Sequence, residues 1–194
     1  MAYFTQIGCL QSNTNVARLN TNTVTISLTD KQLIDDLHHL FPFFNKGSFD
    51  YSRYNLNSKI QYYLRKKNKK LYNHLFNAGV IPRKSAENSE KLFIPKFNSD
   101  LLRHFIRGYF DGDGGIHIRK DNNYPSVSIA GTLSFLNELK AYIPQDIKTS
   151  IRERKSISEM CIYCSNAKKF LEWIYEGASI YLDRKYAIYK SIVK

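Results

Sequence analysis

The chain has 194 residues, of which 43% are hydrophobic, and its 29 Lys and Arg exceed its 17 Asp and Glu to give a formal net charge of +12. The 14 Tyr and 12 Phe exclude a disordered chain, and the length allows one large domain or two small ones. The positive charge favours a nucleic-acid partner, although an ordinary basic protein would share it.

In the first half, residues 3–12 are predicted to form a helix, followed by a hairpin over 16–28. The second arm of this hairpin, Thr-Val-Thr-Ile-Ser-Leu, covers 23–28. Asp30 is then expected to cap a helix that runs to about Leu40, because apolar residues recur there at helical spacing.

A second hairpin is expected over about 48–66 and a further helix over about 68–78. The polar stretch 83–98 would link two halves, and we place their limits at 1–90 and 91–194. The second half repeats the order of the first: helix 99–111, strands near 115–119 and 124–130, helix 132–142, strands near 147–154 and 158–164, helix 165–175, and a last helix from Leu182 to about Val193.

The helix predicted before residue 112 ends in two carboxylates, Asp111 and Asp113, inside a cluster of glycines. A carboxylate at a helix C-terminus faces the negative end of the helix dipole, which is unfavourable unless a cation is held there. Mg²⁺ fits such a place, because it is usually bound by one or two carboxylates together with phosphate oxygens. A solvated turn at a helix end is the simpler alternative.

A calcium loop of the EF-hand type also begins with Asp-x-Asp-Gly, but this sequence does not continue as one. Counting from Asp111, position 6 is Ile116 instead of glycine, and position 12 is Asn122 instead of glutamate. The EF-hand interpretation is therefore rejected.

The chain also resembles itself at a spacing of about 100 residues. Residues 7–16 match 107–116, with Gly8 opposite Gly108, and three apolar positions of the next helix match in both halves: Leu33, Ile34 and Leu37 with Phe135, Leu136 and Leu139. A period of half the chain indicates a tandem duplication.

Residues 106–114 resemble the motif of the LAGLIDADG homing endonucleases, matching it at Gly108, Asp111, Asp113 and Gly114. The resemblance implies an α+β fold of two αββαββα repeats about a pseudo-twofold axis, with two antiparallel sheets that form a saddle over double-stranded DNA. It also implies that the motif helices meet at Gly8 and Gly108. Two divalent metal ions, held by the last motif acids, would hydrolyse one phosphodiester on each strand.

By the same resemblance, Asp113 is the metal-binding catalytic acid and Asp111 a supporting one. In the first copy the matching positions are Asn13 and Gln11, and Asn13 is a weaker ligand than a carboxylate. A basic residue near the scissile phosphate is implied as well, with four candidates: Lys59, Lys66, Lys67 and Lys155.

Polar and basic side chains alternate with apolar ones along the predicted strands, as expected of a sheet face that reads the major groove. An ordinary solvated sheet face would look the same. The predicted DNA-binding residues are Arg18, Asn20, Arg53, Lys59, Gln61, Tyr63, Arg65, His117, Arg119, Lys148, Arg152 and Arg154.

Three cysteines do not make a disulfide framework, and no signal segment or long apolar run is present, so we expect an intracellular protein without membrane contact. The resemblance to single-chain members with two repeats implies a monomer. Two functions stay open. The first is a Mg²⁺-dependent DNA endonuclease that lacks one acid and is reduced to nicking. The second is an inactive relative that binds DNA as a regulator or intron RNA as a maturase.

Overall fold

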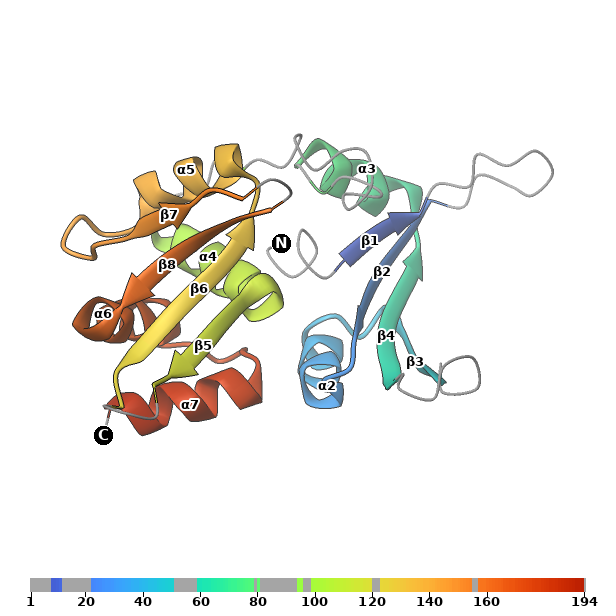
Figure 1. The fold of residues 1–194 in the computed structure, drawn as a ribbon. Coiled ribbons are helices and arrows are strands. Elements are labelled where there is room, and N and C mark those ends of the chain that lie inside the picture. The colour runs from blue at the N-terminus through green and yellow to red at the C-terminus, as the bar shows by residue number, and fades with distance from the viewer. Residues whose placement is uncertain are drawn as a thin grey trace. The chain divides into compact units, whose positions relative to one another are not determined.

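The computed structural model describes residues 8–11, 22–50, 59–78, 80, 94–95, 99–119, 123–154 and 157–193. The chain divides into two compact units, Tyr3–Asn88 (unit 1) and Ser89–Lys194 (unit 2), and each contains a four-stranded antiparallel sheet (Figure 1). The predicted α+β fold with two similar halves is confirmed.

Unit 1 has its sheet strands in the order β1-β2-β4-β3. Its described elements are β1 (Gly8–Gln11), β2 (Thr23–Leu28), α2 (Lys31–Leu40), β3 (Asn45–Asp50), β4 (Ile60–Lys67) and α3 (Lys69–Asn77). Helix α2 buries Leu33, Ile34 and Leu37, which recur at helical spacing. The side chain of Asn68 caps α3 by accepting a 2.9 Å hydrogen bond from the Leu71 N–H.

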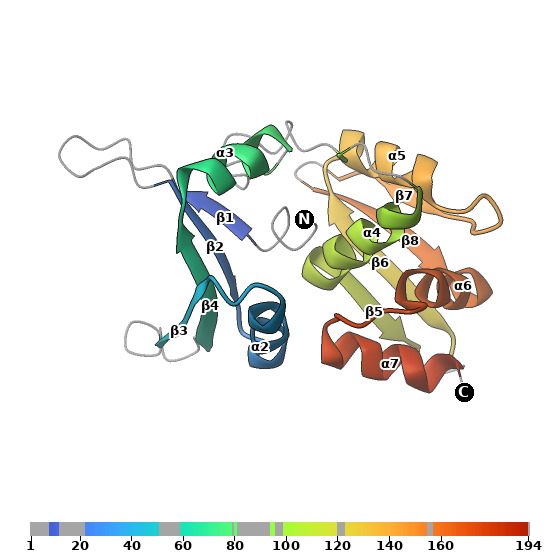
Figure 2. The same ribbon diagram turned by 180° about the vertical axis from the view of Figure 1, so that it is seen from behind.

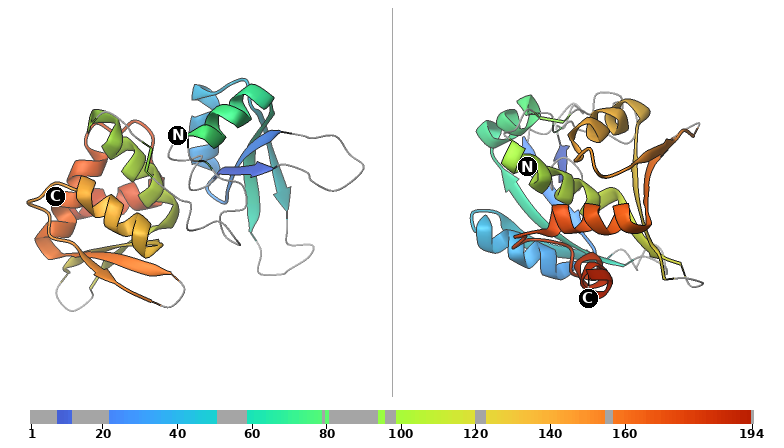
Figure 3. Two further views of the ribbon diagram at one scale, coloured as in Figure 1. Left: turned by 90° about the horizontal axis from the view of Figure 1, so that it is seen from above. Right: turned by 90° about the vertical axis from the view of Figure 1, so that its left-hand side faces the viewer.

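Unit 2 repeats this arrangement, with the strand order β5-β6-β8-β7. Its elements are α4 (Ser99–Asp113), β5 (Gly114–Ile118), β6 (Pro125–Gly131), α5 (Leu133–Tyr142), β7 (Ser150–Arg152), β8 (Ser158–Tyr163), α6 (Cys164–Tyr175) and α7 (Asp183–Val193). Helices α4 and α6 lie behind the sheet in Figure 1 and in front of it in Figure 2, so they cover the same face. The right-hand view of Figure 3 shows them side by side.

The core of unit 2 follows from the period-2 alternation of its central strands. Val127 and Ile129 of β6 and Met160 and Ile162 of β8 are buried against the helices. From the motif, α4 adds Ile106, Tyr109 and Phe110 to the same core. Within the described part of unit 2, no helix covers the opposite face of the sheet (Figures 1 and 2).

The helix predicted over 3–12 is wrong where the structure describes this segment. Gly8–Gln11 form strand β1, which pairs antiparallel with β2. Gly8 is therefore not a helical counterpart of Gly108, which lies buried in α4.

The two sheets give the correct register between the copies. Thr-Val-Thr-Ile at 23–26 corresponds to Ser-Val-Ser-Ile at 126–129, with the Val and Ile buried in both. Gly8 lies opposite Ile26, and Gly114 lies opposite Ile129. Gly8 thus corresponds to Gly114, and in the sequence Ile7 precedes the first glycine as Asp113 precedes the second. The predicted match of residues 7–16 with 107–116 contained no gap. It is wrong because the connection 12–22 is longer than its counterpart 119–124, so the alignment needs a gap there.

Candidate active site and nucleic-acid interface

Asp113 is the last residue of α4, and strand β5 begins at the next residue. Its side chain is exposed. One turn earlier, Tyr109 is buried and donates a 2.9 Å hydrogen bond to the Ala130 carbonyl oxygen. Burial, and then the nearby charge of Asp113, raise the pKa of Tyr109. Asp113 is thus a solvent-facing carboxylate fixed to a buried helix end.

Asp111 has a different environment, although it lies only two residues away. Its side chain is buried, and its two oxygens accept hydrogen bonds from the Tyr175 hydroxyl at 2.8 Å and the Leu182 N–H at 3.2 Å. These contacts join α4 to the end of α6 and to the segment before α7. The carboxylate therefore holds the motif helix in place, and it does not face the solvent as Asp113 does.

Lys185 of α7 closes the C-terminal end of α4. Its buried ammonium group donates to the carbonyl oxygens of Phe110 at 2.6 Å and Asp111 at 3.0 Å, and to that of Gly114. The last carbonyls of a helix have no partner within the helix, and a cation near them is favoured by the helix dipole. Lys185 was not among the four lysines considered from the sequence.

The motif glycine at the start of β5 is required by packing. A Cβ atom on Gly114 would collide with the Phe110 ring and lie 2.6 Å from the Phe110 carbonyl oxygen. No other residue fits between the end of the helix and the strand, so this glycine permits the direct change from α4 to β5.

The helix-free face of the unit 2 sheet, which we call open face 2, carries polar side chains. It comprises His117, Ser126, Ser128, Glu159, Tyr163 and Arg152. The Arg152 guanidinium lies 5.8 Å from the centre of the Tyr163 ring, while Arg154 forms a 3.0 Å ion pair with Glu159. Arg119 follows β5 and is exposed.

In unit 1, the strand face opposite the buried Ile26 and Leu64, which we call open face 1, carries Gln61, Tyr63 and Arg65 of β4. The Arg65 guanidinium lies 4.8 Å from the centre of the Tyr63 ring. Lys59 directly precedes β4 and is exposed. The predicted residues Asn13, Arg18, Asn20 and Arg53 lie outside the described residues.

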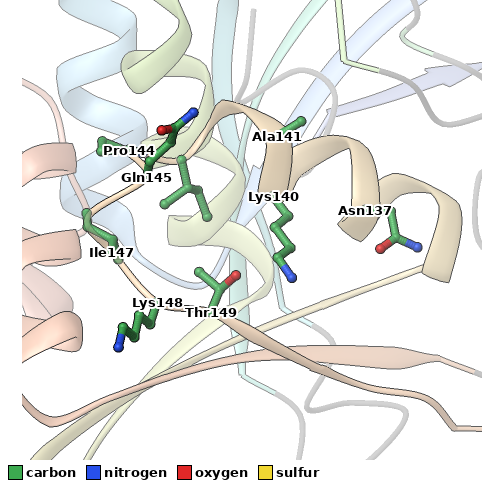
Figure 4. Close-up of a pocket in the computed structure, with 9 residues that line it drawn as sticks. Asn137, Lys140, Ala141, Pro144, Gln145, Ile147, Lys148 and Thr149 are labelled. Carbon is green, nitrogen blue, oxygen red and sulfur yellow. The ribbon is translucent and has the colours of Figure 1, made fainter.

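Lys148 does not belong to β7, because that strand begins at Ser150. Its backbone N–H donates a 2.9 Å hydrogen bond to the Asn166 side chain, and the residue lines a pocket between α5 and the segment before β7 (Figure 4). The lining also includes Asn137, Lys140, Gln145 and Thr149, and it contains no carboxylate. The pocket therefore offers a cation no anionic side chain.

No group of three or more His, Cys, Asp or Glu side chains that could bind a metal ion occurs among the described residues. Cys161 is buried and Cys164 exposed, and both are free thiols. None of the helices in the described ranges is long and apolar enough to cross a membrane.

Comparisons with known proteins agree with the motif and the topology. Residues 100–175 match the family model of the LAGLIDADG-like domain. The structure of I-DmoI in complex with DNA and Ca superposes with a TM-score of 0.63 at 16% identity, covering 98% of this chain and 94% of that one. I-AabMI bound to uncleaved DNA gives 0.60 at 13% identity, with 95% and 85% covered.

The N-terminal LAGLIDADG domain of DUF199/WhiA gives a TM-score of 0.54 at 15% identity, covering 96% of this chain and 83% of that one. No curated protein matches the sequence significantly. Residues 100–175 thus resemble the LAGLIDADG-like domain, and the chain has the fold of the LAGLIDADG homing endonucleases, which confirms the predicted resemblance.

Proposed function

We propose that this chain binds specific sequences of double-stranded DNA through its two open faces, and that Asp113 is its single acid for phosphodiester hydrolysis. One observation carries the proposal: the exposed Asp113 lies at the junction of α4 and β5, where the buried motif helix meets the strand that carries His117 on open face 2. Because β5 is an edge strand of the sheet, we propose that an acid at its start comes within reach of nucleic acid that covers this face.

The charge and the side chains of the open faces support a DNA partner. The net charge of +12 attracts a polyanion, and Arg and Gln on a sheet can read base edges in the major groove. I-DmoI and I-AabMI, which share the fold, have structures in complex with DNA. Since one chain contains both repeats, we propose that it binds as a monomer, inside the cell.

Asp113 has the chemistry of a ligand for Mg²⁺ or another divalent cation. A hard cation prefers carboxylate oxygen and completes its coordination with water and phosphate. When bound, it would polarise the phosphate and activate water. Asp111 is engaged with Tyr175 and Leu182, so its role is to position the helix end from which Asp113 projects.

The register between the repeats makes the proposed site one-sided. The position that corresponds to Asp113 in the first copy is Ile7, whose side chain has no oxygen to offer a metal ion. Asn13, the earlier candidate, lies five positions beyond Gly8 and does not correspond to the acid. We therefore propose slow cleavage of one strand at most.

The same register favours a second candidate function, because an apolar residue in place of an acid is expected of a protein that binds without cutting. Such a protein would act on DNA as a transcriptional regulator or on intron RNA as a maturase.

Two measurements on the purified chain test these functions. Selection from a random duplex library should return an enriched sequence, with an affinity that falls steeply as salt rises. Supercoiled plasmid carrying that sequence should then be nicked slowly in Mg²⁺, and Asp113→Asn should abolish nicking while it retains binding. Binding without any nicking selects the regulator, whereas tight RNA binding without an enriched duplex selects the maturase.

A further inference from the structure

Arg65 lies on open face 1 with its guanidinium over a tyrosine ring. It is exposed in the central strand β4, and its guanidinium stacks at 4.8 Å on the ring of Tyr63, two residues earlier on the same face. It forms no ion pair within the part of the chain that the structure describes. A stacked guanidinium keeps its edge of N–H donors available and loses little conformational freedom when it binds.

Open face 2 offers the same combination from other strands. Arg152 comes from the edge strand β7 and Tyr163 from β8, and they approach to 5.8 Å. The two side chains approach each other across the row formed by Ser150 and the buried Cys161.

A neighbouring arginine shows the contrast. Arg154 lies on the same hairpin as Arg152, but its guanidinium is paired with Glu159 at 3.0 Å. Part of its donor edge is thus occupied by a carboxylate. Within the described residues, Arg152 forms no such pair, so its donors remain available to a ligand.

We infer that Arg65 and Arg152 each read one guanine of the bound duplex, and that Tyr63 and Tyr163 position them. Guanine presents O6 and N7 in the major groove, and the two parallel donors of a guanidinium match this pair. No other base presents two hydrogen-bond acceptors in the major groove. The inference rests on the proposed DNA binding, which it extends to individual base positions.

The test is duplex selection with the full chain, comparing each arginine variant with a matched variant from the same sheet. Arg65→Ala should lower the preference for guanine at one position by about 10- to 100-fold, and Arg152→Ala should do so at a different position. The matched variants, Lys67→Ala in β4 and Arg154→Ala, should leave both guanine preferences in place, with any loss of affinity shared by all sequences.

Variants of Tyr63 test whether its ring positions Arg65 or only contributes to packing. Tyr63→Leu removes the ring and should relax the preference at the position of Arg65 alone, whereas Tyr63→Phe keeps the ring and should preserve it. The inference is overturned if Arg65→Ala and Lys67→Ala behave alike, or if Tyr63→Phe relaxes the preference as much as Tyr63→Leu. If the unmodified chain enriches no duplex, the proposed DNA binding itself has failed.

Discussion

The carboxylate of Asp111 accepts a 2.8 Å hydrogen bond from the Tyr175 hydroxyl, and both residues are buried. They lie 64 positions apart in the sequence. Two acids of one motif therefore have separate tasks: Asp111 joins α4 to α6, while Asp113 faces the solvent.

This division predicts opposite effects on stability. Asp111→Ala removes the carboxylate that accepts from the buried Tyr175 hydroxyl and the Leu182 N–H, so the free energy of unfolding should fall by about 2–4 kcal/mol. Asp113→Ala removes an exposed acid near the negative helix end and should change it by less than about 1 kcal/mol. Urea unfolding of the two variants measures the difference, and equal losses would contradict the assignment of Asp111.

Lys185 should be as important for stability as Asp111. Lys185→Met keeps most of the aliphatic stem but removes the donor to three carbonyl groups at the junction of α4 and β5. We expect a loss of at least about 2 kcal/mol in the free energy of unfolding. Lys190→Met, an exposed position in the same helix, is the matched control and should have little effect.

The register between the repeats predicts which substitution improves cleavage. If Ile7 occupies the place of the missing acid, Ile7→Asp should raise cutting of the second strand, and Asn13→Asp should not. Counting nicked and linear plasmid over time distinguishes the two variants. If Asn13→Asp alone raised cutting of the second strand, the alignment that pairs Asn13 with Asp113 would be correct, and the alignment from the strand register would be wrong.

His104 should make unit 2 sensitive to mild acid. Burial, and then the charges of Arg107 and Arg103, lower the pKa of His104 from its usual 6.5. The unfolded chain therefore takes up a proton first, so the contribution of His104 to stability is complete above about pH 6.5 and declines as the pH falls below it. Melting temperatures between about pH 8 and pH 5 should fall less for His104→Asn than for the unmodified chain.

Most of the fold could be predicted from the sequence because helical and strand periodicity are local signals. Helix α2 was predicted over its observed length, and Thr23–Leu28 form the predicted strand. The prediction for the first motif copy was wrong for a specific reason. Glycines were matched without a gap, although the repeated Thr-Val-Thr-Ile and Ser-Val-Ser-Ile segments already contained the correct register.

The surroundings of the candidate site were less predictable, because they depend on contacts between distant residues. The motif pointed to both acids, but nothing near Asp111 in the sequence indicates that Tyr175 and Leu182 bind it. Lys185 lies in a segment that is weakly repeated in the first half, since Asp-Arg-Lys-Tyr at 183–186 resembles Pro-Arg-Lys-Ser at 82–85. That likeness marks a repeated position without revealing which groups the lysine binds.

Because Lys185 stabilises the C-terminal end of α4, this helix end depends on a residue that is translated later. The lysine lies 75 positions after Phe110, one of the residues whose carbonyl groups it binds. During translation, the end of α4 and Asp113 leave the ribosome well before the helix that fixes them. The carbonyl groups around Asp113 therefore gain the Lys185 hydrogen bonds only when α7 has been synthesised. A ribosome stalled before Lys185 would carry the motif helix without these bonds.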